Sequence, residues 1–287
     1  MEKQDGKLTA QKTWGNSPAG TTSAKGAAPG TKEFFDRALK YREEYEQPWL
    51  PEVVPFHTMA GKRVLEIGFG AGFDTYAFMR VDARYTGIDI TPENPERARQ
   101  HMALFGYTPD VRQGDAESLS FDDGAFDAVY SNGVLHHVPS IETAFSEVAR
   151  VLKPGGDFYV ILYHKNSVFY RVTLAIWYQI IHGGWRRETL KERLSRIEYN
   201  ETGETPIVNV YSRSEVRRLL QDAGLEVRSI KVRKLVWEEL PSIWFVHRYF
   251  KYIPRGLLST IGKAFGWYVI GHAVKPPLSP HSAATPK

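Results

Sequence analysis

Cysteine is absent from this chain of 287 residues. Its absence excludes disulfides, thiolate metal sites, iron–sulfur clusters and every mechanism that uses a cysteine nucleophile. No apolar run in the sequence reaches the ~18 residues of a membrane-spanning helix. The first residues, MEKQDGKLTAQ, also lack the apolar core of a secretory signal. These absences predict a soluble, cytoplasmic protein.

Long runs of like charge are missing as well. The chain has 37 Lys and Arg against 33 Asp and Glu, a net charge of +4. Such a small excess does not indicate a nucleic-acid surface, so we expect a small molecule as the partner. The sequence shows no clear cluster of metal-ligating side chains, and we expect no metal. A hydrophobic content of 42% is ample for a packed core.

Short apolar runs alternate with helical patterns through the middle of the chain. The runs are typical of strands buried on both faces of a sheet. Strands are expected at 63–67, 85–88, 110–113, 126–131 and 157–162, and helices at about 72–80, 95–105 and 141–152. This alternation predicts an α/β fold, a doubly wound, Rossmann-like, mostly parallel sheet with helices on both faces.

Composition also predicts the domain boundaries. Residues 1–31 are rich in Gly, Ala, Ser and Thr, which favours a flexible tail, with a cap over the active site as the alternative. We expect a single domain over 32–275, with a helical lid insertion at 165–210 that is too long for an ordinary connection. Residues 276–287 are rich in Pro and Ser and are expected to be a disordered tail.

The stretch VLEIGFGAGFDT, residues 64–75, combines a strand with a glycine-rich turn. In a doubly wound sheet this first turn meets the ligand, and glycines let the backbone approach it. Gly68, Gly70 and Gly72 follow G-x-G-x-G rather than the dinucleotide spacing G-x-G-x-x-G, so no pyrophosphate cradle is indicated. Glu66, inside the strand, fits a cationic or amino-bearing ligand better than a phosphate.

Two aspartates follow the next two strands. Asp89 ends YTGID about twenty residues past the glycines, where a carboxylate can accept from both hydroxyls of a ribose. Asp115, in QGDAESLSF, can accept from an exocyclic amine. Singly, each is more often a turn or cap residue. Together they outline an adenosine-binding site.

Five ordered motifs now carry a resemblance: VLEIGFGAGFDT, GIDIT, GDAESLSF, FDAVYSNGVLHHVPS and EVARVLKPGGDFYVILY. They resemble the class I S-adenosylmethionine-dependent methyltransferases, and more narrowly the small-molecule, type 11 methyltransferase domain. The resemblance covers residues 61–163 and continues in VYSRSEVRRLLQDAGLEV. It implies S-adenosyl-L-methionine as cofactor and a seven-stranded sheet. The last strand would be antiparallel between the fifth and sixth, which suits GWYVIGHAVK, residues 266–275.

Position by position, the resemblance implies a set of cofactor contacts. Gly68, Phe69, Gly70 and Gly72 would contact the methionyl portion, with Glu66 nearby. Asp89 would bind the ribose, Ile90 would pack on the adenine face, and Asp115 with Ala116 would hold the adenine edge. Ser131 would form the floor beside the sulfonium.

His136 and His137 follow the fourth strand and are the candidate catalytic bases. An imidazole with its ordinary pKa of about 6.5 can accept a proton from an acceptor hydroxyl at neutral pH. For either histidine alone, a structural role at the start of a helix explains its presence at least as well as a catalytic role does. His136 is favoured because related methyltransferases that use a histidine here place it just after the V-L pair.

The acceptor must be inferred from the divergent segments. Residues 166–185 are apolar nearly all round, which predicts a lid packed on the core and on a second subunit, a lining for an apolar substrate, or a peripheral membrane contact. YSNGV replaces the Asn/Asp-Pro-Pro-aromatic run expected of a base-methylating enzyme. We therefore expect methyl transfer to a small or lipid-like metabolite, with oxygen favoured. A non-catalytic cofactor-binding protein and a nicotinamide-dependent oxidoreductase are the alternatives.

Overall fold

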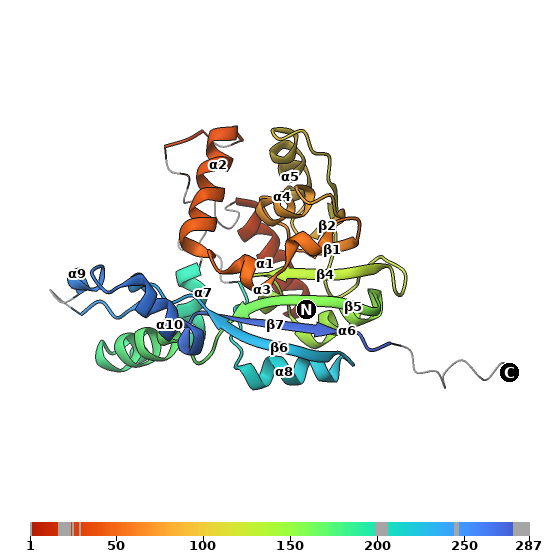
Figure 1. The fold of residues 1–287 in the computed structure, drawn as a ribbon. Helices are drawn as coiled ribbons and strands as arrows, with labels where there is room; N and C mark the ends of the chain where they lie inside the picture. The colour runs from red at the N-terminus through yellow and green to blue at the C-terminus, as the bar shows by residue number, and fades with distance from the viewer. Residues whose placement is uncertain are drawn as a thin grey trace.

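A seven-stranded sheet lies at the centre of the computed structural model, which describes residues 2–16, 24, 26–28, 30–198, 206–243 and 247–277 (Figure 1). The strand order is β3-β2-β1-β4-β5-β7-β6. All neighbours are parallel except β7, which is antiparallel to β5 and β6. The strands are β1 (Arg63–Ile67), β2 (Arg84–Asp89), β3 (Asp110–Gln113), β4 (Phe126–Asn132), β5 (Leu152–Tyr163), β6 (Glu226–Arg233) and β7 (Tyr268–Val274). The predicted fold and the place of the last strand are confirmed.

Apolar runs in the central strands supply both faces of the sheet. Val64 packs in one hydrophobic cluster and Leu65 in another, because successive side chains of a strand point to opposite faces. Val160 and Ile161 divide in the same way in β5. A central strand of this sheet is buried on both faces, so its sequence is a continuous apolar run and does not alternate between apolar and polar residues.

Helices cover both faces (Figure 1). α6 illustrates the local cause: Ser140 caps its amino terminus, and Ala144, Phe145 and Val148 form an apolar stripe against the sheet. The α-helices are α1 (Glu2–Asn16), α2 (Lys32–Tyr41), α3 (Leu50–Val53), α4 (Phe73–Met79), α5 (Asn94–Ala103), α6 (Ile141–Val151), α7 (Leu190–Glu198), α8 (Arg213–Asp222), α9 (His247–Phe250) and α10 (Arg255–Phe265).

The insertion after β5 is helical in its described part. It contains η5 (Phe169–Ile181), a wide helix of the π type, the 3₁₀ turn η6 (Gly184–Arg186), and α7. Leu174 and Leu194 pack in the core cluster that covers one face of the sheet. Residues 199–205 of the insertion, like 278–287 of the expected carboxyl-terminal tail, lie outside the described residues. In the part of the chain that is described, no helix combines the length and apolarity needed to cross a bilayer.

Candidate active site

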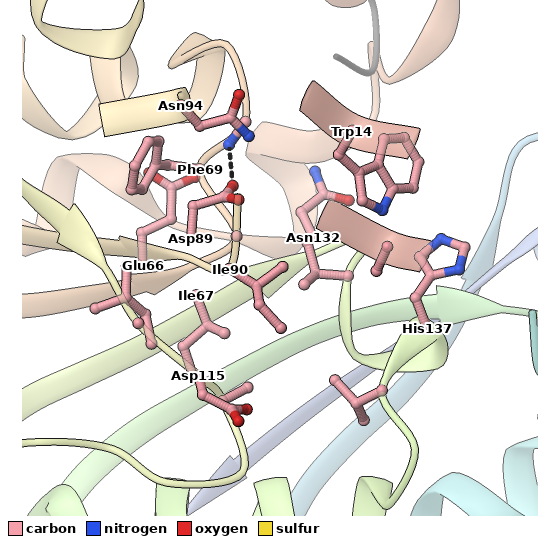
Figure 2. Close-up of a pocket in the computed structure, with 18 of the residues that line it drawn as sticks. Trp14, Glu66, Ile67, Phe69, Asp89, Ile90, Asn94, Asp115, Asn132 and His137 are labelled. Carbon is pink, nitrogen blue, oxygen red and sulfur yellow. Dashed lines mark hydrogen bonds between the residues drawn. The ribbon is translucent and has the colours of Figure 1, made fainter. Parts of the chain in front are cut away.

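A cavity opens where β1, β2 and β4 end, at the point where the strand order reverses (Figure 2). Its wall brings together residues from the glycine turn, the strand ends and α1. Nine of the residues predicted from sequence line it: Glu66, Gly68, Phe69, Gly70, Asp89, Ile90, Asp115, Ala116 and His137. Gly72, Ser131 and His136 are not among the lining residues.

Glycine is required at each position of the turn for a different structural reason. Gly68 has φ +80°, and a Cβ there would lie 2.2 Å from Val134, so packing alone excludes a side chain. Gly70 has φ +52°, and a Cβ there would meet no atom within 4 Å. Gly72 starts α4 and faces Ala98 instead. Only Gly70 combines a left-handed backbone with open space on the cavity side.

Asp89 is held in place by the backbone around it. Its Oδ2 accepts from the amide of Gly70 at 2.9 Å and its Oδ1 from that of Thr91 at 2.9 Å. Burial raises the pKa of Asp89, and these amides, with the Asn94 side chain, oppose that rise. Figure 2 shows Asp89 and Asn94 on the same side of the cavity. The Asn94 side chain also donates to this carboxylate, so a ligand hydroxyl would share Asp89 with these donors.

The helix α1 forms the wall opposite the glycine turn. Lys7 Nζ lies 2.6 Å from Asp115 Oδ2 and 2.6 Å from Glu117 Oε2. Trp14 lies edge-on to the His137 ring, with 5.3 Å between centroids (Figure 2). Composition favours a flexible tail over 1–31, with a cap as the alternative. In the structure Glu2–Asn16 is a helix that contributes Lys7, Ala10 and Trp14 to the cavity.

Buried carboxyl groups surround the end of β1. Glu66 Oε2 accepts from Tyr85 at 2.6 Å and from Thr75 at 3.0 Å. Burial, and then the nearby charge of Asp74, raise the pKa of Glu66 to about 8. Asp74 accepts from Arg42 Nη2 at 2.6 Å and Nε at 3.1 Å. A cation bound beside Glu66 would favour its carboxylate form.

The two histidines after β4 have different surroundings. His137 lines the cavity, and its Nδ1–H donates to the carbonyl oxygen of Ile207 at 2.6 Å, which leaves Nε2 as the basic nitrogen of the neutral ring. His136 is fully buried behind it, and its ring is tilted by 36° against that of Tyr163 with 3.8 Å between centroids. The sequence favoured His136 as the base, but the structure places its ring outside the cavity wall.

Replacing His136 by Phe tests this burial. Neither of its ring nitrogens has a hydrogen-bond partner in the described residues, and burial holds the pKa of His136 well below its ordinary value. We expect His136→Phe to retain the ring contact with Tyr163 and to leave the free energy of unfolding at pH 7.5 unchanged or raised by about 1 kcal/mol. Urea denaturation measures it.

Acidification should enlarge the difference. In the wild type the unfolded state binds a proton below pH 6.5 that the folded state refuses, so stability falls as pH decreases, by up to about 1.4 kcal/mol per pH unit. At pH 5.5 His136→Phe is therefore expected to be the more stable protein. His57→Phe, at an exposed position, serves as control. Loss of stability in His136→Phe at both pH values would show that the imidazole makes a stabilising polar contact.

Several lining residues were not predicted. Lys7 and Asn94 come from segments without a recognisable ligand motif. Glu117 and Asp74 lie inside two of the quoted motifs, GDAESLSF and VLEIGFGAGFDT, and Asp74 also lies in the first turn of the helix that follows the glycine turn. Their acidic side chains next to the predicted ligand residues were the available signal.

Comparison with known proteins identifies a methyltransferase domain in part of the chain. The profile described as a methyltransferase domain matches residues 65–160, which contain the glycine turn, both aspartates and both histidines. The chain carries a methyltransferase domain. Similar proteins include a sterol 24-C-methyltransferase of Gibberella zeae, 35% identical over 48% of this chain and 35% of that protein. A ubiquinone biosynthesis O-methyltransferase of Xanthomonas oryzae is 37% identical over 41% of this chain and 49% of that one.

Two further similarities cover more of the chain at lower identity. A phthiotriol/phenolphthiotriol dimycocerosates methyltransferase of Mycobacterium leprae is 30% identical over 58% of this chain and 57% of that protein. The chain thus spans between about a third and just over half of these relatives' lengths. The structure of a geranyl diphosphate C-methyltransferase of Streptomyces coelicolor superposes with a TM-score of 0.54 at 17% identity, covering 94% of this chain and 98% of that one. That likeness concerns the fold.

Proposed function

We propose that this protein is an S-adenosyl-L-methionine-dependent methyltransferase that acts on a small or lipid-like metabolite, with oxygen as the favoured acceptor atom. The observation that carries the proposal is the convergence of the glycine turn with carboxyl groups from successive strand ends on one cavity. The names of the similar proteins, which include sterol and ubiquinone methyltransferases, favour an apolar acceptor.

The residues present fit this cofactor. Asp89 lines the cavity as a carboxylate acceptor for the ribose, and Gly70 exposes backbone to the cavity. We assign the adenine edge to Asp115 and Ala116 and the adenine face to Ile90, because all three line the cavity. An acidic lining suits a ligand that carries sulfonium and ammonium charges. Five carboxyl groups line the cavity: Glu66, Asp74, Asp89, Asp115 and Glu117.

The chemistry asks little of the protein beyond position. When bound, S-adenosyl-L-methionine supplies an already activated methyl group. The protein must align the acceptor and exclude water, which can supply most of the barrier reduction. His137 Nε2 is the group on the cavity wall that can take the proton of an acceptor hydroxyl, because its Nδ1–H is held by Ile207. Trp14 of α1 lies beside that ring and lines the same cavity.

A nicotinamide dinucleotide fits this cavity poorly. In dinucleotide-binding folds the pyrophosphate sits at the amino terminus of the helix after the glycine turn. Here Asp74 occupies the first turn of that helix, where its Oδ1 accepts from Arg42 Nε and its Oδ2 from Arg42 Nη2 and the Tyr130 hydroxyl. A pyrophosphate would meet a carboxylate at the place where it needs backbone N–H groups.

Calorimetric titration tests the proposal. We expect the protein to bind S-adenosyl-L-methionine or its demethylated product and not NADH. Asp110→Ala is the matched control for a substitution of the cavity aspartate Asp89, and it is expected to bind the cofactor normally. Asp110 is a half-exposed aspartate of β3 that is not among the cavity-lining residues. Transfer of a labelled methyl group to an extracted acceptor separates an enzyme from a non-catalytic binding protein. Binding of NADH alone would overturn the assignment.

A further inference from the structure

Two segments at the carboxyl edge of the sheet carry a surface that methyl transfer does not use. The first, residues 164–187, follows the end of β5 and contains η5 and η6. The second, residues 240–267, lies between β6 and β7 and contains α9 and α10. In Figure 1 the two segments, green and blue, extend from the same end of the molecule. Thr173 Oγ1 donates to the carbonyl oxygen of Glu239 at 2.6 Å, which ties η5 to the start of the second segment. We call them together the basic–apolar face.

The first segment exposes a row of apolar side chains. Val172, Ile176 and Ile180 recur every four residues along η5 and are 38%, 48% and 68% exposed. Ile181 and Trp185 extend the row at 59% and 63%. Leu174 is buried in the core, and Phe169 and Tyr170 pack against the same cluster. The segment therefore uses one side for the fold and leaves the other unpartnered in the described structure.

The second segment repeats the arrangement. Leu257, Ile261 and Phe265 recur every four residues along α10 and are 52%, 38% and 53% exposed, while Leu258 is buried. Tyr252, at 71%, lies just before this helix. Helices with one apolar side facing solvent are typical of interaction surfaces, since ordinary protein surfaces avoid large contiguous apolar patches.

Charge distinguishes this face from the rest of the molecule. Each segment has four Lys or Arg residues and no Asp or Glu, so the two together carry +8 while the whole chain carries +4. The remainder of the chain therefore has a net charge of −4. Lys165 is paired with Glu215, and no ion pair is recorded for the other seven cations among the described residues.

Cations on this face lie directly beside exposed aromatic rings. Arg186 is 5.0 Å from the ring centroid of Trp185, and Lys251 is 5.2 Å from that of Tyr252. Arg248 is 4.9 Å from that of Tyr249. Tyr and Trp with neighbouring Lys and Arg suit the headgroup region of a bilayer, where the ring body is accommodated among apolar groups and the charge meets phosphate.

We propose that the basic–apolar face docks onto an anionic lipid surface. A lipid interface can take the apolar side chains and satisfy the cations at the same time. A second copy of the chain would instead oppose eight cations with eight, and a nucleic acid would leave the Leu, Ile and Phe side chains without a partner. Because both segments adjoin the carboxyl edge that carries the cavity, docking would bring that edge toward the bilayer.

Vesicle co-sedimentation of the full chain tests this. We expect binding to vesicles of phosphatidylcholine mixed with phosphatidylglycerol, at least about tenfold weaker binding to phosphatidylcholine alone, and a decline with added salt. The double variant Lys251→Glu/Arg255→Glu is expected to lose at least about tenfold in partitioning to the anionic vesicles. Ile180→Ser/Phe265→Ser, which keeps every cation, is expected to weaken binding to a similar degree.

Matched controls lie elsewhere on the surface. Arg217→Glu on α8 and Leu104→Ser after α5 change an exposed cation and an exposed apolar residue away from the face, and both are expected to bind vesicles normally. Absence of vesicle binding, equal binding to both lipid compositions, or dissociation of a dimer by the face variants would each overturn the proposal. Neither cofactor nor acceptor is needed in this assay, so its failure is distinct from failure of the methyltransferase assignment.

Discussion

Asp89→Ala is expected to weaken binding of S-adenosyl-L-methionine by roughly 1.5–3 kcal/mol, about 10- to 150-fold in the dissociation constant. The variant removes the charged acceptor for the ribose and leaves the amides of Gly70 and Thr91 without their partner. Asp89 is buried, so water replaces the carboxylate poorly. Calorimetry of the two proteins measures the difference.

The fold is expected to survive this change. Asp89 ends β2, whose pairing with β1 runs through backbone hydrogen bonds that the substitution leaves intact. Asp89→Asn keeps the shape and one acceptor oxygen, and we expect an intermediate loss of affinity. Asp110→Ala, at the start of β3, controls for the loss of an aspartate as such. Unchanged affinity in a folded Asp89→Ala protein would refute the adenosine assignment.

The strands were predictable because their cause is local. RVLEI and FDAVYS are apolar runs that only a strand buried on both faces explains, and the predicted 63–67 and 126–131 agree with β1 and β4 to within one residue. The antiparallel β7 was predicted on other grounds, because its place in the sheet followed from the family resemblance.

The helix α1 was not predictable in this way. Its sequence, EKQDGKLTAQKTWGN, has no apolar stripe. The contacts that hold it are long-range: Lys7 to Asp115, Gln11 to the carbonyl oxygen of Ile90, and the carbonyl oxygen of Gly15 to Arg97. No local pattern encodes such contacts, because helix stability in proteins comes largely from tertiary packing.

The sequence does not distinguish the positions of the His136 and His137 rings, for a geometric reason. Both lie in the short 3₁₀ turn Leu135–His137, where neighbouring side chains diverge by roughly 120°. Sequence places the pair at the right edge of the sheet and leaves open which ring faces the cavity. The tertiary contact with Ile207, seventy residues further along the chain, orients His137.

His137→Asn is expected to lower turnover by at least about tenfold, the low side of general-base effects, and to leave S-adenosyl-L-methionine affinity within about threefold. The Asn amide can still donate toward the carbonyl oxygen of Ile207, but it has no basic nitrogen. His136→Phe, whose ring lies outside the cavity wall, is the matched control and is expected to retain near-normal turnover.

The pH profile separates a base from a merely structural residue. Burial lowers the pKa of His137 to about 4, so its ring is neutral and able to accept a proton at every pH well above that value. The sequence alone suggested a rate that rises through the ordinary imidazole pKa of about 6.5. Instead we expect kcat/KM to be flat between pH 6 and 8 and to fall only toward pH 4, with that acid limb absent in His137→Asn. A limb near pH 6.5 that persists in His137→Asn would assign proton transfer to another group.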